Sequence, residues 1–164
     1  MVDDEYWMRQ ALSLAEEAKE NNEVPVGAII VLNNEIIGKG SNSPITSCDP
    51  TAHAEIQAIR AACKKIQNYR LPEAVLYVTL EPCSMCAGAI VHARLKRVVY
   101  GALEPKSGAI ESQSNFFESS FLNHKVTTKS GVLADLSATK MSSFFQNRRR
   151  QKKEIRTRQQ EEKK

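Results

Sequence analysis

The sequence predicts an α/β protein with three layers, in which helices cover both faces of a central mixed sheet of about five strands. Short runs rich in β-branched residues alternate along the chain with longer segments whose apolar residues recur at helical spacing. The 164 residues, of which 41% are hydrophobic and 26% charged, are enough for one buried core. This composition excludes a wholly disordered or collagen-like chain.

The N-terminal part of the chain predicts one helix and one β-hairpin. Apolar residues at helical spacing and an acidic start favour a helix over 3–22. The β-branched run 26–32 predicts a buried strand, and the two asparagines after it suit a tight turn because asparagine tolerates positive φ. The returning strand is expected at 35–40, and the stretch 41–50, with two prolines, predicts a loop.

The middle of the chain alternates helix and strand. An apolar stripe over 51–67 predicts a helix, and the run 74–79 predicts the third strand. A second internal helix is expected over 83–94, with Pro82 directly before it as a start signal. The run 97–100 predicts the fourth strand.

The C-terminal part is less regular. Residues 101–123 mix Pro, Gly, Ser and Asn with aromatic residues, and a loop this long in a small domain is often functional. We expect a short edge strand at 125–128 and a last helix at 133–146. The chain is therefore interpreted as one domain over 1–146, followed by a basic tail over 147–164 that is helical or partly disordered.

The net charge of +4 is unevenly distributed. Residues 146–164 carry nine Lys/Arg and three Glu, a net +6, whereas the other 145 residues carry fourteen Lys/Arg and sixteen Asp/Glu, a net −2. A charged tail is often only solvated, and it also suits the electrostatic attraction of a polyanion such as RNA. Both interpretations stay open at this level.

Two features predict a cytoplasmic protein with no membrane partner. The N-terminus is acidic, and the longest apolar stretch, 24–32, has nine residues, whereas a helix needs about 20 to cross a bilayer. In a reducing cytosol the four cysteines are not expected to form disulfides. Cys48 and Cys63 stand alone and are interpreted as small hydrophobic residues.

Two motifs, 30 residues apart, carry the candidate chemistry. The His-Ala-Glu triplet 53–55 lies at the start of one predicted helix, and the Pro-Cys-Ser-Met-Cys segment 82–86 lies at the start of the next. Cys83 and Cys86 share a helix face, and a helix N-terminus favours the thiolate that binds metal. With His53 they supply three ligands of a tetrahedral zinc site and leave the fourth position for water, as in catalytic zinc sites.

Glu55 is expected to act beside such a metal rather than on it. It lies two residues from His53, about 200° around a helix, so it is poorly placed as a further ligand. A carboxylate at this place can take a proton from water and pass it on, first as general base and then as general acid.

Two other uses of these residues compete with a catalytic zinc site. A thioredoxin-like redox pair is the usual rival for two cysteines at this spacing, but the residues around Cys83 lack the types typical of it. A structural zinc site needs a fourth ligand, for which His92 and Cys63 are the nearest residues. His92 falls off the face of the two cysteines, and Cys63 continues the apolar stripe of its helix.

The combined pattern of His-x-Glu followed by Pro-Cys-x-x-Cys resembles that of the zinc-dependent nucleobase deaminases. Within that superfamily the chain is similar to the bacterial tRNA-specific adenosine deaminases of the TadA type, from about Met8 to the tail. The segments that carry the resemblance are 23–28, Asn42 with Pro44, 49–55, 79–90, 101–102, Lys106, 108–109, 123–124 and 144–145 with the arginines that follow. The resemblance implies a cytidine deaminase-like fold.

The resemblance also implies an activity and its cofactor. One zinc ion per subunit would lie on His53, Cys83 and Cys86, with Glu55 as the proton shuttle. The enzyme would be a hydrolase that converts the wobble adenosine to inosine in the anticodon loop of an arginine tRNA. It would act as a homodimer with the RNA site close to the subunit interface, and we expect no DNA partner.

The resemblance implies a pocket for the flipped adenine around Val26, Ala28 and Asn42, although Asn42 also suits a simple turn. The residues expected to contact RNA are Glu104, Asn123, His124, Phe145, Arg148 and Arg149. Members of the family commonly have Asp at the position of Glu104, and the extra methylene still permits the same polar contact. His124 suits a structural hydrogen bond equally well. Phe145 and the arginines suit base stacking and phosphate contacts, whereas Phe144 is expected in the core.

Two other functions remain open at the level of sequence. A related deaminase acting on guanine, cytosine or free nucleotides would share the same zinc motif. A non-catalytic, zinc-stabilised RNA-binding module would need four protein ligands and would not need Glu55.

Overall fold

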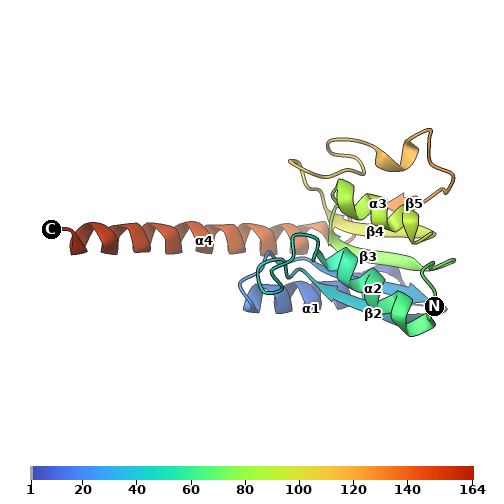
Figure 1. The fold of residues 1–164 in the computed structure, drawn as a ribbon, viewed down its shortest axis with the longest axis horizontal. Coiled ribbons are helices and arrows are strands. Elements are labelled where there is room, and N and C mark those ends of the chain that lie inside the picture. Colours follow the sequence, from blue (N-terminus) through green and yellow to red (C-terminus); the bar gives the residue numbers. More distant parts are fainter. Residues whose placement is uncertain (1) are drawn as a thin grey trace.

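The computed structural model describes residues 2–164, which form four α-helices, one short 3-10 helix and one five-stranded sheet (Figure 1). The elements are α1 (Asp4–Glu20), β1 (Gly27–Leu32), β2 (Glu35–Ser41), α2 (Ala54–Ile66), β3 (Val75–Leu80), α3 (Ser84–His92), β4 (Arg97–Ala102), η1 (Phe116–Glu118), β5 (Thr127–Lys129) and α4 (Ala134–Glu162). All five predicted strands and all four predicted helices are present.

The sheet is mixed, as the sequence predicts. Its strand order is β2-β1-β3-β4-β5. Strand β1 is antiparallel to both β2 and β3, whereas β3, β4 and β5 run parallel to one another. Both asparagines of the β1–β2 turn have positive φ, 51° and 62°, in agreement with the predicted hairpin.

Helices cover both faces of the sheet and make it the middle of three layers (Figure 1). Successive residues of a strand point to opposite faces. Thus Ile30, Leu76 and Val98 pack beneath α2 and α3, and their neighbours Ile29, Tyr77 and Val99 pack beneath α1. The N-terminal part of α4 lies beside α1 and over β4, and the rest of α4 projects away from the body.

Two glycines of β2 bring α2 close to the sheet. A Cβ atom at Gly40 would overlap backbone atoms of Ala54 and Ala58, and a Cβ at Gly38 would overlap the backbone of the next turn of α2. Because α2 begins at Ala54, the contact at Gly40 fixes the end of the helix that carries the His-Ala-Glu triplet. Glycine at these two positions therefore determines how closely the helix that carries the His-Ala-Glu triplet approaches the sheet.

Two helix boundaries differ from the prediction. Helix α2 begins at Ala54 rather than near residue 51, because the Asp49 carboxylate accepts the N–H and the hydroxyl of Thr51 and holds a turn there. Helix α4 continues to Glu162 instead of ending at residue 146. The segment 147–162 contains no Gly or Pro and is rich in Arg, Lys, Gln and Glu, which are good helix formers. The predicted domain limit thus falls within one continuous helix.

The remaining expectations concern the lone cysteines and the membrane. Cys63 is half-buried against the core, in agreement with its interpretation as a small hydrophobic residue. The same interpretation is wrong for Cys48, which is exposed in the loop after β2. Over residues 2–164, no helix combines the length and the apolar character that a bilayer crossing requires.

Candidate active site

His53 and Cys83 occupy equivalent places, the N-cap positions of α2 and α3. Both residues have extended backbone, and neither side chain caps its own helix. Their side chains are therefore free to turn toward a shared centre between the two helix N-termini. Cys86, in the first turn of α3, is buried at the same centre.

The three side chains converge with the spacing of a metal site. The Nδ1 atom of His53 lies 3.6 Å from the Sγ of Cys83 and 3.5 Å from the Sγ of Cys86. A tetrahedral zinc ion with ordinary Zn–N and Zn–S bond lengths places such atoms about 3.5 Å apart. Within residues 2–164 this is the only group of three or more His, Cys, Asp or Glu side chains whose donor atoms all lie within 4.8 Å of one another.

The site favours a thiolate at Cys83. Hydrogen bonds from the Cys86 and His53 side chains lower the pKa of the Cys83 thiol to about 4, against the opposing effect of burial. The hydrogen bond to Cys83 and burial raise the pKa of Cys86, and the Cys83 contact raises that of His53. Metal binding requires that these protons leave, so the affinity of the group for a metal depends on pH.

Glu55 lies next to the three donor atoms without joining their group. Its side chain is only 4% exposed, and this burial raises the pKa of the carboxyl above its usual range. It lines the same cavity as His53 and Cys83. This is the place that the sequence predicts for a proton-transferring carboxylate.

A cavity of about 180 Å³ opens above these groups. Its lining comes from several elements: Val24, Val26, Asn42, His53, Glu55, Leu80, Glu81, Cys83, Glu104 and Ser107. Two of the predicted pocket residues, Val26 and Asn42, therefore line it. The third, Ala28, is fully buried in β1 and is not part of the lining.

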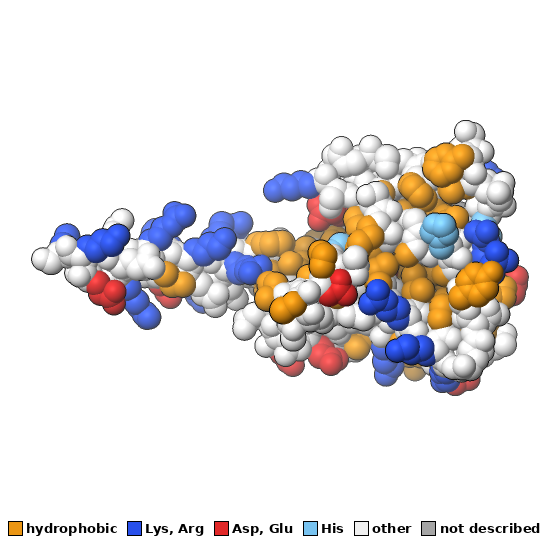
Figure 2. Space-filling model, viewed as in Figure 1, with side chains coloured by type: hydrophobic (Ala, Val, Ile, Leu, Met, Phe, Trp, Pro, Cys, Tyr) orange, Lys and Arg blue, Asp and Glu red, His pale blue; other side chains and the backbone are white. Residues whose placement is uncertain are grey.

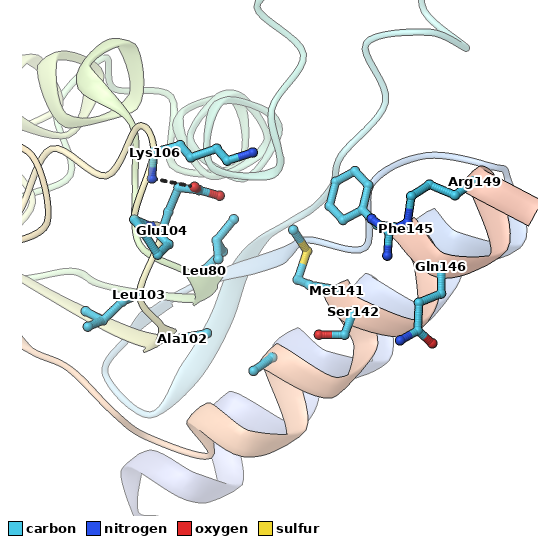
Figure 3. Close-up of a pocket in the computed structure, with 12 residues that line it drawn as sticks. Leu80, Ala102, Leu103, Glu104, Lys106, Met141, Ser142, Phe145, Gln146 and Arg149 are labelled. Carbon is cyan, nitrogen blue, oxygen red and sulfur yellow. Dashed lines mark hydrogen bonds between the residues drawn. The ribbon is translucent and has the colours of Figure 1, made fainter.

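A larger groove of about 570 Å³ lies beside this cavity, between α4 and the segment after β4. The two spaces share Leu80 and Glu104. Figure 3 shows Phe145 and Arg149 of α4 facing Glu104 and Lys106 across the groove. An aromatic ring and cationic groups thus border the route into the small cavity.

The comparisons with known proteins agree with this geometry. A family model described as MafB19-like deaminase matches residues 2–150. The chain is 54% identical over 151 residues to the tRNA-specific adenosine deaminase of Haemophilus influenzae, an alignment that covers 92% of this chain and 87% of that protein. The chain belongs to the tRNA-specific adenosine deaminase family.

Solved structures place the family within a wider fold. A structure from a study of A-to-I editing by tRNA:A34 deaminases at the wobble position of transfer RNA has a TM-score of 0.80 and 46% identity, and covers 82% of this chain and 98% of that chain. A guanine deaminase from Bacillus subtilis has a TM-score of 0.60 and 37% identity, with coverages of 73% and 87%. The predicted three-layer, cytidine deaminase-like fold is confirmed.

The remaining predicted RNA contacts are spread over the molecule. Arg148 is partly buried and lies over the ring of Phe144, which is in the core as expected. Asn123 is exposed, and the Nε2 atom of His124 lies 2.6 Å from the carbonyl oxygen of Leu95, before the start of β4. Neither Asn123 nor His124 lines the cavity or the groove.

Two buried carboxylates near the site were not singled out from the sequence. Glu23 is 1% exposed and accepts the N–H groups of Ile45 and Thr46, together with the Thr46 hydroxyl, in the loop that follows Asn42. Glu81 is 2% exposed and lies directly before the Pro-Cys-x-x-Cys segment. The sequence signal that could have identified Glu23 and Glu81 is a carboxylate inside or beside an otherwise apolar run.

Proposed function

We propose that the chain is a zinc-dependent hydrolase that converts the wobble adenosine of a tRNA anticodon loop to inosine. The observation that carries this proposal is the meeting of a three-donor metal group and a buried carboxylate at one cavity. The membership of the tRNA-specific adenosine deaminase family supports adenosine in tRNA as the substrate.

His53, Cys83 and Cys86 would hold the zinc ion. Their donor types and their mutual distances of 3.5–3.6 Å from the imidazole to the two sulfurs fit this metal. Zinc at such a site supplies a Lewis acid that lowers the pKa of water to about 7. Three protein ligands are the number typical of catalytic zinc, whereas structural zinc sites have four, so this group would suit a catalytic site.

Glu55 would move the protons. Its carboxylate accepts a proton from the attacking water and delivers it to N1 of adenine, which makes C6 electrophilic. The water oxygen forms a bond to C6, and Glu55 then takes the remaining proton from this hydroxyl group and passes it to the amino group. The C6–N6 bond breaks, ammonia leaves, and the base becomes hypoxanthine, so the overall reaction consumes one water molecule.

The cavity would receive the flipped base. Val26 supplies an apolar wall and Asn42 a hydrogen-bonding edge, and both line the cavity with Glu55. Extruding a base from a duplex costs a few kcal/mol, and the cost is least in a strand that is already single. A base in an anticodon loop, which is already single-stranded, can therefore enter the cavity at little cost.

The groove beside the cavity would hold the neighbouring nucleotides. Phe145 is 38% exposed and can stack on a base, and Arg149 can contact a phosphate. Glu104 borders both the cavity and the groove, as the expected polar contact with the RNA requires. Figure 2 shows further Lys and Arg side chains along the projecting part of α4.

Several finer statements remain predictions. An arginine tRNA as the substrate, a homodimer and a cytoplasmic location are implied by the resemblance or expected from the sequence. Gel filtration with light scattering tests the dimer, and modification of a set of tRNAs that carry adenosine at the wobble position tests the choice of tRNA.

A substrate panel tests the proposed function. The zinc-loaded protein is incubated with an anticodon stem-loop that carries adenosine at the wobble position, and separately with free adenosine, guanine and cytidine. We expect inosine in the stem-loop and no conversion of the free compounds. Conversion of guanine alone would favour a guanine deaminase, which is the activity named for one of the structural relatives.

A further inference from the structure

We propose that Glu81 is a positioning residue of this deaminase. Its buried carboxylate holds the segment 104–112 in the conformation that places Glu104 and Ser107 along the substrate cavity. The inference rests on the function proposed above, and it gives Glu81 a role outside metal binding and proton transfer.

Four backbone N–H groups and one hydroxyl point at this single carboxylate. The N–H of Glu104 donates to Oε1 at 3.1 Å. The N–H groups of Ile110, Glu111 and Ser112 donate to Oε2 at 3.1, 2.9 and 3.0 Å. The Ser112 hydroxyl also donates to Oε1. Both oxygens are therefore occupied by donors from the two ends of one loop.

The Glu81 charge is balanced by these donors. Among the residues that the structure describes, none forms a salt bridge with Glu81, and its side chain is only 2% exposed. A buried carboxylate is costly unless it is hydrogen-bonded. Opening the loop would remove its donors, so the burial of this charge stabilises the closed loop conformation.

Glu81 also lies at the junction between the loop and the metal-binding segment. Its own N–H donates to the carbonyl of Ala102 at 2.9 Å, and the N–H of Ala109 donates to the carbonyl of Pro82 at 2.9 Å. Pro82 is followed directly by Cys83, a member of the candidate metal-binding group. One short stretch thus orders the loop relative to the metal group.

Gly108 packs against the Glu81 carboxyl group, so a substitution there tests the same interaction from the loop side. A Cβ atom at this position would overlap the Glu81 carboxyl group. The Gly108 N–H also donates to the carbonyl of Glu104 at 2.9 Å, so the loop passes close over the carboxylate. A change at Gly108 therefore disturbs the contact from the loop side and leaves Glu81 itself in place.

Glu81→Gln tests the role in the reaction. The amide keeps the size of the side chain but presents its NH₂ group to some of the N–H donors. We expect KM for the stem-loop to rise at least tenfold, with kcat changed by less than threefold and one zinc ion retained per chain. A KM equal to that of the unaltered protein, at full zinc content, would overturn the proposal.

Amide hydrogen exchange tests the loop directly and does not depend on activity. In Glu81→Gln the amides of Glu104, Ile110, Glu111 and Ser112 are expected to exchange at least tenfold faster than in the unaltered protein. Unchanged protection would refute the anchoring role. If the unaltered protein deaminates no stem-loop, the proposed function fails, and the exchange experiment still decides whether Glu81 holds the loop.

Asp4→Asn is the matched control for loss of a partly buried carboxylate. Asp4 binds Arg97, Tyr77 and Lys129, among which Tyr77 packs on the opposite face of the sheet from α2 and α3. This variant is expected to be less stable and to keep the KM of the unaltered protein. An equal rise in KM in Asp4→Asn and Glu81→Gln would assign the effect to lost stability and contradict positioning.

A double-mutant cycle completes the test. Gly108→Ala alone is expected to raise KM because its Cβ displaces the carboxyl group of Glu81. Glu81→Ala removes that group, so Gly108→Ala should have little further effect in the Glu81→Ala background. Additive effects of the two substitutions would show that Gly108 acts independently of Glu81 and would contradict the proposed contact.

Discussion

Phe144 and Phe145 are adjacent on α4 and have different surroundings. Phe144 is buried at 6% exposure beneath Arg148, whereas Phe145 is 38% exposed at the edge of the groove. Their rings meet edge to face with centroids 5.5 Å apart. The buried ring therefore supports the exposed one, which leaves a rigid aromatic surface for a nucleotide.

Phe145→Ala is expected to raise KM for the stem-loop by about tenfold, because base–aromatic stacking contributes roughly 1–3 kcal/mol. Titration of activity against stem-loop concentration measures this change. Tyr69→Ala is the control, since Tyr69 is an exposed aromatic residue, at 73%, that does not line the groove. An unchanged KM in Phe145→Ala would remove this residue from the RNA site.

Asp4 joins the start of α1 to the sheet. Its carboxylate accepts two hydrogen bonds from the Arg97 guanidinium, at 3.0 and 2.9 Å, and further ones from Tyr77 and Lys129. The hydrogen bonds from Arg97 hold the pKa of Asp4 well below its usual range. A carboxyl group whose pKa is lower in the folded state stabilises the fold above its unfolded pKa, and this stabilisation is lost as the pH falls.

Asp4→Asn is expected to lower the free energy of unfolding by about 2 kcal/mol near neutral pH. The difference from the unaltered protein should shrink as the pH is lowered from about 5 toward about 2, because Asp4 then becomes protonated during unfolding. Urea unfolding at several pH values measures both effects. A difference that stays constant over this range would contradict the ionic role of Asp4.

The sequence predicts the candidate metal ligands more readily than the residues that position the loop beside them. Metal ligands must be of particular types at particular spacings, so His53, Cys83 and Cys86 can be found from residue identity alone. The role of Glu81 depends on N–H groups that lie 23 to 31 residues further along the chain. No local sequence pattern predicts that these N–H groups will converge on one carboxylate, so the contact can be identified only in the folded chain.

At the scale of elements, the approach of α2 to β2 sets the position of the His-Ala-Glu triplet 53–55. Gly40 packs against the first turn of α2, where any Cβ atom would overlap the helix backbone. The helix would have to move outward to accept a larger residue, and His53 would move with it.

Gly40→Ala is expected to destabilise the fold by about 1–3 kcal/mol, as overpacking does, and to weaken zinc retention during dialysis against a chelator. Gly88→Ala is the matched control, since Gly88 lies within α3 and has open space where a Cβ would be. This control is expected to be more stable by about 0.5–1 kcal/mol because alanine favours helix. Equal stability of Gly40→Ala and the unaltered protein would contradict the close packing.

Periodicity along the sequence predicts every strand and α-helix, but not every boundary. The start of α2 depends on the turn that Asp49 and Thr51 form, and this competes with the first helical turn. The length of α4 could not be read from an apolar stripe, because residues beyond 150 are exposed all round and have none. Good helix formers alone extend it.

At the scale of the whole molecule, positive charge is concentrated on a helix that projects from the body (Figure 1, Figure 2). Residues 151–164 are all exposed and carry six Lys/Arg and three Glu, a net +3. This projection continues from the groove that Phe145 and Arg149 line. Its place supports a role in attracting the RNA backbone, with base selection left to the cavity.

Deleting residues 151–164 is therefore expected to weaken binding of the stem-loop. The dependence of log Kd on log salt should also flatten, by about one unit for each phosphate contact that is lost. Fluorescence anisotropy at several salt concentrations measures both quantities, with zinc content and thermal stability as controls. An unchanged salt dependence would show that the tail is only solvated.

The central claim is that the cavity deaminates a wobble adenosine with the help of Glu55. Mass spectrometry of one anticodon stem-loop, after incubation with the zinc-loaded protein or with its Glu55→Gln variant, tests this most directly. The account predicts inosine at the wobble position with the unaltered protein and at least a hundredfold slower conversion with the variant at equal zinc content, in line with the roughly 10²–10⁴-fold contribution of acid–base catalysis. Equal rates for the two proteins, or conversion by neither, would contradict it.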